Sequence, residues 1–528
     1  MKKLLYLILL FFFFKANAQR NVILIIADDL GTDYFGFNED YVDTVDVPNI
    51  RSLLSKGVRF NNAMSNPVCS NTRSGILTGR YSFRTGVGNI VGGIGGSGQL
   101  DTSEITIPRL LEIYNPNIGK ANIGKWHLHQ PMPAGNLLFP NVLGYDHFEG
   151  PFIGQLTSYN NWTKYTNAVA STVTNYATSE NVNNALSWLN TQNSNNPFFL
   201  WLAFNAPHNP LHLPPAGLHS YTNLSGTQAN INNDPKAYFK AMIQALDTEI
   251  GRLFDSLQVM NLLDSTDIIF IGDNGNSVQT AQISDLDKAK GTVYQYGVHV
   301  PFIIAGPSVE NQGRVSDALV NTTDIFTTVL ELFQYNNWIS QIPSSKPVDS
   351  KSLMPIIKNL GTQVRPWAFC EIFKAIPDSV DAKAMRNVEY KLIRFDYGAE
   401  EFYNLITDPE ETFNLLTAPL SGTALSNYNY LCNEMTTLLG SGSICSPSAI
   451  NSLDGYSDLL AYPNPFSMRI YINPKYRGEM LELTDNSGQL IYSGINIESQ
   501  DFSNLSEGIY FIKIKNKSKT GLKLIKSN

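Results

Sequence analysis

Two pairs of oxygen-bearing side chains stand out in this sequence for the chemistry they could do. Asp28-Asp29 and Asp273-Asn274 each come directly after an apolar run. Carboxylate and amide oxygens are hard ligands that suit Ca²⁺ or Mg²⁺, and the set lacks the histidines that a two-zinc hydrolase needs. An acidic pair after a strand is also a common helix N-cap. Two such pairs at expected strand ends favour a metal site.

Cys69 precedes a short predicted helix, Ser70–Leu77, in a segment that runs from Cys69-Ser-Asn-Thr-Arg73 to Thr78-Gly79-Arg80. A thiolate at this position is a nucleophile. The backbone N–H groups of a helix start favour an anion, and Arg73 adds a fixed positive charge. The alternatives are a small buried apolar residue or a disulfide with Cys370, which would abolish the chemistry. Together the residues indicate chemistry on an anionic ester.

The elements that must position these groups alternate along the chain. Four continuous apolar runs predict strands buried on both faces: residues 21–27, 197–204, 267–271 and 300–305. Helical patterns lie between them, which predicts an α/β fold with a large, mostly parallel sheet flanked by helices. Ligands bind beyond the carboxyl ends of strands in such sheets. Asp28, His208 and Asp273 all fall at such ends.

Four motifs in combination resemble the sulfatase family of the alkaline-phosphatase superfamily. They are the segment Cys69–Arg80, similar to C-x-P/A-x-R…T-G-R, and the segments Gly124-Lys-Trp-His-Leu128, Ala206-Pro-His-Asn-Pro210 and Lys290-Gly-Thr-Val-Tyr294. The resemblance runs from about Arg20 to about Leu416. It implies an alkaline-phosphatase-like sheet followed by a small antiparallel C-terminal subdomain.

The resemblance implies a bound cation and a modified cysteine. One Ca²⁺ would be held by five side chains: Asp28, Asp29, Cys69, Asp273 and Asn274. A formylglycine-generating enzyme would oxidise Cys69 to formylglycine, and the hydrate of that aldehyde would attack sulfur and later expel sulfate. The ion would withdraw charge from a sulfate oxygen and lower the barrier to this attack.

The resemblance also gives roles to the other motif residues. Six residues would carry out catalysis: Cys69, Arg73, Lys125, His127, His208 and Lys290. Arg73 would steady the hydrate, and the two lysines would bind sulfate oxygens. His127 would hydrogen-bond or deprotonate the hydrate. His208 would protonate the leaving oxygen, a task that suits a side chain titrating near neutral pH.

The sequence departs from the family pattern at four positions. Asn71 stands where the family has Pro or Ala, in the segment that the modifying enzyme reads. Gln295, Tyr296 and His299 replace the Glu, Gly and Arg of K-G-T-x-Y-E-G-G-x-R. We expect Cys69 still to be modified. We expect the later departures to alter a local turn and the rim of the pocket, and to leave Lys290 in its role.

Several polar residues lack motif support. Four histidines belong here: His129, His147, His212 and His219. We expect ordinary or substrate-rim positions for them, with His212 nearest to substrate because it follows the His208 loop. Lys288 is expected to be solvated.

The chain divides into five predicted parts: a signal peptide at residues 1–18, a catalytic α/β domain at 19–365, a subdomain at 366–440, a linker at 441–458 and a β-rich module at 459–528. The last part resembles the sorting domain of the type IX secretion system through Tyr462-Pro-Asn-Pro465 and Leu505-Ser-Glu-Gly-Ile-Tyr510. A carbohydrate-binding sandwich or a structural appendage is the alternative. Cys432 and Cys445 could close a short disulfide loop.

The predicted function follows from these parts. The formal net charge of −8 argues against nucleic acid as a partner. We expect a sulfuric ester hydrolase, secreted or held on the outer surface of a bacterium by the type IX machinery, that acts on sulfated carbohydrates and on artificial aryl sulfates. Two alternatives stay open: a phosphonate or phosphodiester hydrolase of the same superfamily, and a non-catalytic protein that binds sulfated glycans if Cys69 is unmodified.

Overall fold

The computed structural model describes residues 20–37, 41–92, 96–193, 195–375 and 379–440, and residues 461–526 with gaps at 463–465, 467, 473–475, 477 and 516–520. The predicted signal peptide and linker therefore lie outside the described residues. No helix within the described ranges is long and apolar enough to cross a membrane.

A ten-stranded sheet forms the centre of the catalytic part, in the order β10-β2-β9-β8-β1-β7-β3-β4-β5-β6. The strands are β1 (Asn21–Ala27), β2 (Gly57–Met64), β3 (Gly119–Gly124), β4 (His147–Gly150), β5 (Trp162–Thr166), β6 (Val169–Val173), β7 (Phe198–Ala203), β8 (Thr266–Gly272), β9 (Phe302–Ala305) and β10 (Arg314–Asn321). Strand β1 is parallel to both β7 and β8. This confirms the predicted large, mostly parallel sheet.

The last of the four predicted strands differs in direction from the others. Strand β9 runs antiparallel to its neighbours β8 and β2. The chain leaves β8 and returns through the segment that contains Lys290 and the short helix α9 (Gln295–Val298), so it enters β9 from the carboxyl end of β8. That return path places residues 290–299 beside the strand ends that carry the candidate site.

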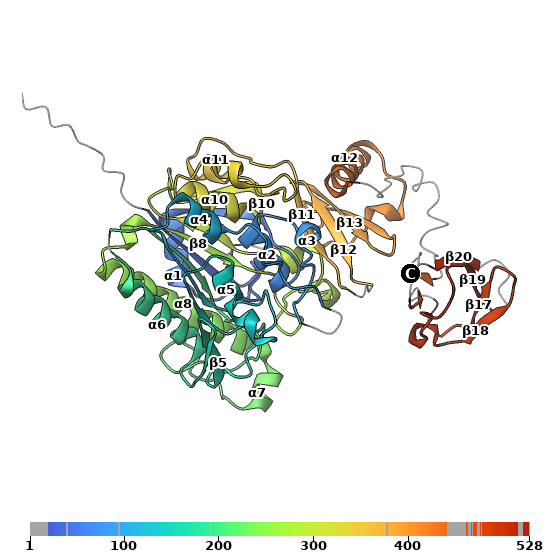
Figure 1. Cartoon of the computed structure of the whole chain (residues 1–528), viewed down its shortest axis with the longest axis horizontal. Coiled ribbons are helices and arrows are strands. Elements are labelled where there is room, and N and C mark those ends of the chain that lie inside the picture. The colour runs from blue at the N-terminus through green and yellow to red at the C-terminus, as the bar shows by residue number, and fades with distance from the viewer. Residues whose placement is uncertain are drawn as a thin grey trace, which may run out of the picture.

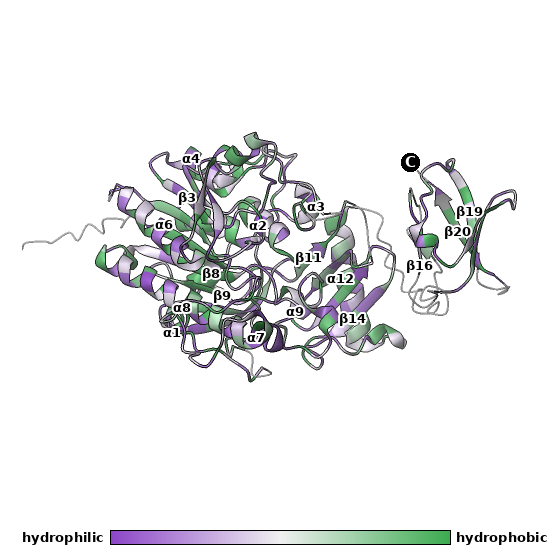
Figure 2. Cartoon of the chain, turned by 90° about the horizontal axis from the view of Figure 1, so that it is seen from below, coloured by the Kyte–Doolittle hydropathy of each residue, from purple (hydrophilic) through white to green (hydrophobic). Residues whose placement is uncertain are grey.

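Helices cover both faces of the sheet (Figure 1). Helices α1 (Pro48–Ser55), α6 (Ala177–Thr191) and α8 (Pro235–Val259) pack together on one face, and α2 (Cys69–Thr78), α4 (Ile107–Tyr114) and α10 (Asp324–Leu332) on the other. Side chains of β1 alternate between the two cores, Leu24 facing one and Ile25 the other. Figure 2 shows apolar residues gathered on the central strands.

Shorter helices complete this part: α3 (Ser82–Thr85), α5 (Phe139–Val142), α7 (Gln228–Asn233) and α11 (Met354–Ile357). A four-stranded antiparallel sheet follows, built from β11 (Ala368–Ile372), β12 (Ala382–Arg386), β13 (Tyr390–Phe395) and β14 (Glu400–Asn404). Helix α12 (Gly422–Leu439) packs on it through Leu431 and Met435. The other face packs on Met64 and Val68, just before Cys69. The subdomain therefore supports the start of α2.

The last module is all β and has its own apolar core. Strands β15 (Ala461–Tyr462) and β16 (Tyr471–Ile472) pair, and a second sheet has the order β18-β17-β19-β20, with β17 (Leu481–Asp485), β18 (Leu490–Gly494), β19 (Gly508–Ile514) and β20 (Gly521–Lys526). The sequence Asp485-Asn-Ser-Gly488 favours a hairpin turn, and Gly488 has a φ of 86° in the turn between β17 and β18. A second hairpin turn that the sequence favours, at residues 516–519, lies outside the described residues.

Candidate active site

The two oxygen-bearing pairs meet at the carboxyl edge of the sheet. Strands β1 and β8 are parallel neighbours with Ala27 opposite Gly272, so the residues that follow them are adjacent. The backbone N–H of Asp29 donates to Asp273 Oδ1 over 3.0 Å, and Asn274 Nδ2 donates to Asp29 Oδ1 over 2.9 Å. All four side chains are buried, Asp28 included. Asp29 has a φ of 62°, a conformation that non-glycine residues adopt rarely and that is often found at functional sites.

Two oxygen atoms of this cluster lack hydrogen bonds and could contact a cation. Asp28 Oδ1 and Asn274 Oδ1 are buried without a hydrogen-bond partner, which is costly unless something else contacts them. Ligand atoms of Asp28, Cys69 and Asp273 lie within 4.8 Å of one another. Burial raises the pKa of Asp28 to about 8, with Asp273 adding to the effect and Lys125 opposing it. The residues present therefore fit a hard divalent cation such as Ca²⁺.

Cys69 is the first residue of α2, and its side chain contacts His127. Cys69 Sγ lies 3.1 Å from His127 Nδ1. Burial raises the pKa of the thiol, and burial together with Lys125 holds the pKa of His127 well below its usual range. His127 is therefore neutral at pH 7 and can accept a proton from a group at position 69. Its φ of 54° is again the left-handed conformation.

Gly154 makes room for the ring of His127, and the sequence motifs did not reveal this role. A Cβ atom at Gly154 would lie 2.2 Å from His127 Cε1, so only glycine leaves room for this ring. The segment also fixes the histidine backbone, because His127 N donates to Phe152 O over 3.2 Å. No motif spans residues 152–154, so packing alone shows their role.

Arg73 lies one turn along α2 from Cys69 and is fully buried. Its Nη2 and Nε donate to Asp273 Oδ2 over 2.7 and 3.0 Å, and its Nη1 donates to the carbonyl of Lys125 over 3.0 Å. Nη2 is also 3.8 Å from Asp28 Oδ1. The side chain thus ties the helix that carries Cys69 to the oxygen cluster.

Three further cationic or titratable groups face the same carboxylates. Lys125 Nζ lies 2.5 Å from Asp28 Oδ2, Lys290 Nζ donates to Asp29 Oδ1, and His208 Nε2 is 3.6 Å from Asp29 Oδ2. Burial acts to raise the pKa of Asp29, but His208 and Lys290 outweigh it and the pKa falls below its usual range. Burial lowers the pKa of His208 to about 4. The structure therefore brings all the predicted site residues into one cluster.

Asn71, the departure from the family pattern, forms three hydrogen bonds in the folded protein. Its Oδ1 accepts from the backbone N–H of Val68 over 3.3 Å, which caps α2. Its Nδ2 donates to the carbonyls of Gly88 and Glu371 over 3.3 and 3.1 Å. The side chain is fully buried. Asn71 therefore ties the start of α2, the helix that carries Cys69, to strand β11 of the subdomain.

The residues without motif support that follow have hydrogen-bond partners outside the cluster. His129 accepts from Trp126 and contacts the carbonyl of Leu100, while both ring nitrogens of His212 are hydrogen-bonded, to Pro210 O and the Tyr176 hydroxyl. The expectation for Lys288 is wrong. Its side chain is buried because its ammonium donates to the carbonyl of Glu411 over 2.6 Å and lies over the ring of Tyr294.

The cysteines are in two states. Cys69 and Cys370 are free and buried, so the bridge between them that would abolish the chemistry is absent. Cys432 is disulfide-bonded. Its predicted partner, Cys445, lies outside the described residues.

The sheet and this cluster define a class: α/β proteins in which the strand ends gather buried carboxylates, a buried cysteine and several positively charged side chains at one edge of the sheet. The Sulfatase family model matches residues 20–335. The models described as N-sulphoglucosamine sulphohydrolase, C-terminal, and Secretion system C-terminal sorting domain match residues 287–435 and 460–527. The chain belongs to the sulfatase family, and the resemblance of its last module to a sorting domain is confirmed.

Individual proteins support this assignment. Arylsulfatase J of Mus musculus is 27% identical over 337 residues, which are 60% of this chain and 53% of that protein. The chain thus aligns with only about half of that relative. An ulvan-active sulfatase of Formosa agariphila is 24% identical over 80% of this chain and 81% of its own length. The crystal structure of Ps i-CgsB in complex with k-i-k-neocarrahexaose shares the fold, with a TM-score of 0.66, 23% identity and coverage of 83% of this chain and 97% of that one.

Proposed function

We propose that the protein removes sulfate from a sulfated polysaccharide outside the cell, by means of formylglycine made from Cys69 and one bound Ca²⁺. The observation that supports this most is the cluster at the ends of β1 and β8. There, two buried oxygens have no hydrogen-bond partner, and Asp28 lies close to Cys69. Lys125 pairs with Asp28, and Lys290 pairs with Asp29. The alternatives, phosphoester hydrolysis and glycan binding without turnover, are outcomes of the test below.

The cation would be held by Asp28, Asp29, Asp273, Asn274 and the residue at position 69. When bound, it would supply positive charge that stabilises the charge developing on the sulfate oxygens. Lys125 and Lys290 are now paired with Asp28 and Asp29. Once a cation neutralises these carboxylates, the N–H groups of both lysines can donate to sulfate oxygens instead.

Formylglycine would supply a hydrated aldehyde, with one hydroxyl to attack sulfur and a second whose deprotonation releases the sulfate. His127 is neutral, and its Nδ1 lies 3.1 Å from Cys69 Sγ. It would therefore be placed to accept a proton from a hydrate hydroxyl at position 69. His208 lies beside Asp29. Its pKa of about 4 leaves it neutral at pH 7 in the protein without substrate, so we propose that the bound sulfate ester raises this pKa and lets His208 donate a proton to the leaving sugar oxygen. Arg73 would keep position 69 in register with the oxygen cluster through Asp273.

The polysaccharide and the location rest on separate observations. The ulvan-active relative and the structure that holds neocarrahexaose support a sulfated glycan as substrate. The sorting domain supports export by the type IX machinery, with the signal peptide predicted at residues 1–18. A formylglycine-generating enzyme is the partner that the modification of Cys69 requires.

The test combines mass spectrometry with assays on the full chain produced beside a formylglycine-generating enzyme. We expect the peptide that contains position 69 to carry the aldehyde. We also expect sulfate release from aryl sulfate and from sulfated polysaccharide to stop when EGTA removes calcium, and to return when calcium is added. Faster turnover of aryl phosphate than of aryl sulfate would overturn the proposal, as would an unmodified thiol in protein that binds sulfated glycans without releasing sulfate.

A further inference from the structure

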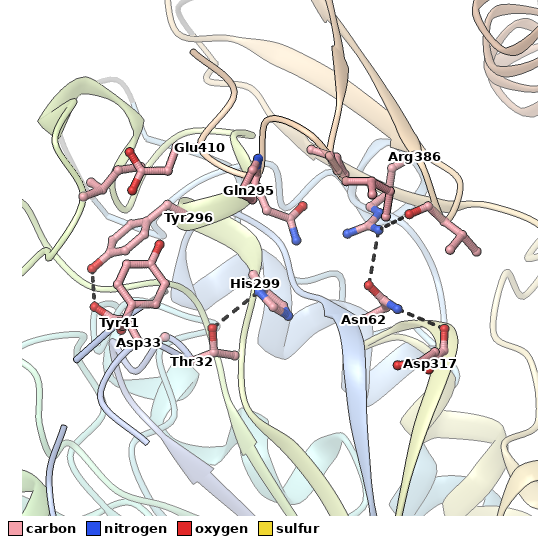
Figure 3. Close-up of a pocket in the computed structure, with 16 residues that line it drawn as sticks. Thr32, Asp33, Tyr41, Asn62, Gln295, Tyr296, His299, Asp317, Arg386 and Glu410 are labelled. Carbon is pink, nitrogen blue, oxygen red and sulfur yellow. Dashed lines mark hydrogen bonds between the residues drawn. The ribbon is translucent and has the colours of Figure 1, made fainter. Parts of the chain in front are cut away.

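A cavity of about 630 Å³ lies where the catalytic part meets the antiparallel subdomain (Figure 3). The loop after β1, the first residues of α9 and the last residue of strand β12 all contribute to its wall. Its size is typical of a site for a small organic ligand. None of the candidate catalytic residues lines it, although Asp33 and Gln295 follow Asp29 and Lys290 closely along the chain.

One wall carries a buried arginine whose partners are all neutral. Arg386 is 4% exposed. Its Nε donates to the carbonyl of Asn387, and its Nη2 donates to the carbonyl of Val388 and to Asn62 Oδ1, over 2.9 to 3.3 Å. No ion pair found among the described residues includes Arg386. Burial lowers the pKa of this guanidinium to about 10, and the carboxylate of Glu411, which forms an ion pair with Lys391, opposes that effect without pairing with Arg386. A buried guanidinium without an ion pair of its own is unusual, because a buried charge is normally paired.

The opposite wall is where the sequence departs from the family pattern. Gln295, Tyr296 and His299 replace Glu, Gly and Arg, and all three line the cavity. In Figure 3 the amide of Gln295 and the guanidinium of Arg386 point toward one another. Gln295 Oε1 has no hydrogen-bond partner. A glutamate at position 295 would thus place a carboxylate toward Arg386, and this chain has an uncharged amide there.

The acidic groups in the wall do not take the place of that carboxylate. Asp33 accepts hydrogen bonds from Tyr296 and Asn276. The carboxylates of Asp317 and Glu410 accept from Asn61 and Ser284. These acids favour a ligand with hydroxyl groups and a single anionic group over a small inorganic anion, because hydroxyls can donate to carboxylates.

Aromatic and aliphatic side chains supply the apolar surface that a sugar ring needs. The rings of Tyr41 and Tyr296 lie 6.1 Å apart at 65°, and Ile283 and Leu405 add aliphatic wall. Polar groups around a partly apolar cavity are the usual features of a small-ligand site. We infer that this cavity binds one acidic sugar unit of a glycan, with Arg386 and Gln295 holding its sulfate or carboxylate group. This second site requires no hydrolysis within it.

Binding is measured by calorimetry on the full chain with Cys69→Ala, so that nothing is hydrolysed. The probes are a sulfated carrageenan hexasaccharide, a galacturonate trisaccharide and inorganic sulfate. We expect Arg386→Gln to weaken binding of at least one saccharide by about tenfold or more. Gln295→Glu should also weaken binding, because the new carboxylate would form an ion pair with the Arg386 guanidinium and compete with the anionic group of the ligand. Lys383→Gln removes a charge from the same strand away from the cavity and should leave binding unchanged.

Unchanged binding would overturn the inference: both Gln295→Glu and a folded Arg386→Gln would then bind the two saccharides as tightly as the parent protein does. The inference would also be overturned if inorganic sulfate, but neither saccharide, bound in a manner that depends on Arg386. Should Arg386→Gln fail to fold, Gln295→Glu decides, since restoring the charge pair should raise the melting temperature while it lowers affinity. Aryl sulfate turnover is measured separately with Cys69 intact. It should change less than about twofold in Gln295→Glu, so failure of hydrolysis and failure of this site are distinguishable.

Discussion

The oxygen cluster after β1 and β8 and the cavity beside Arg386 share one segment, residues 290–299, yet the buried groups left without a matching partner differ between them. In the cluster, Lys125 and Lys290 pair with carboxylates, and two buried oxygens still lack a partner. In the cavity, Arg386 has only neutral partners. Unmatched buried groups cost free energy unless a ligand completes them. The comparison supports the proposed cation in the first region and the proposed anionic ligand in the second.

The largest expected effect comes from position 69. Cys69→Ala should abolish sulfate release, because no aldehyde can form there, while the melting temperature stays within a few degrees. The measurement is turnover of aryl sulfate beside a thermal unfolding scan. Cys370→Ala is the matched control, since Cys370 is the other buried free cysteine and lies outside the cluster. Equal loss of turnover in both variants would remove the special role of Cys69.

Removing a lysine from the cluster should cost less than removing Cys69. Lys125→Ala should lower kcat by about 10²- to 10³-fold, which corresponds to about 2–4 kcal/mol of activation free energy, because one fixed donor to the sulfate is lost. The substitution also leaves Asp28 without its 2.5 Å partner. Calcium should therefore raise the melting temperature of this variant more than that of the parent. An equal calcium effect in both proteins would argue against a cation beside Asp28.

We expect Asn71 to affect the position of residue 69 in the folded protein more than the conversion of Cys69 to formylglycine. Asn71→Ala removes three hydrogen bonds at the start of α2 and should lower stability by about 1–3 kcal/mol. We expect the fraction of formylglycine, measured by mass spectrometry, to stay equal or to rise, while kcat per modified enzyme falls by about tenfold. A fall in modification with unchanged kcat per modified enzyme would show that Asn71 acts on the unfolded segment instead.

The buried carboxyl of Glu371 should make the stability of the protein depend on pH. Glu371 is fully buried, Oε2 lacks a partner, and burial raises the pKa of its carboxyl from 4.5 to about 7. Between these values the folded protein keeps a proton that the unfolded chain has released, so stability falls as pH rises through this window. Glu371→Gln should remove the effect and be more stable by up to about 3 kcal/mol above pH 7. Urea unfolding across this range checks it, and parallel pH profiles would contradict it.

Much of the fold and of the cluster could be predicted from the sequence. Long β-branched runs such as residues 21–27 bury both faces and so specify strands, and parallel strands bring Asp28 and Asp273 to one edge. The site residues lie in local motifs that a linear pattern retains. The divisions between the five parts stay predictions.

The parts that the sequence did not reveal depend on packing between distant segments. Gly154 is needed only because the ring of His127 comes to rest against it. Lys288 is buried because the subdomain brings the carbonyl of Glu411 to it. The cavity beside Arg386 exists only once β12 faces α9, and no local pattern encodes that contact.

The most direct test is a crystal structure of the protein grown with calcium, with the anomalous signal recorded at the ends of β1 and β8. A single ion should contact Asp28 Oδ1 and Asn274 Oδ1, the two buried oxygens that lack partners. Lys125 and Lys290 should then turn from their carboxylates toward the sulfate position. A map at saturating calcium that shows no ion there, with both lysine–carboxylate pairs intact, would contradict the proposed metal site.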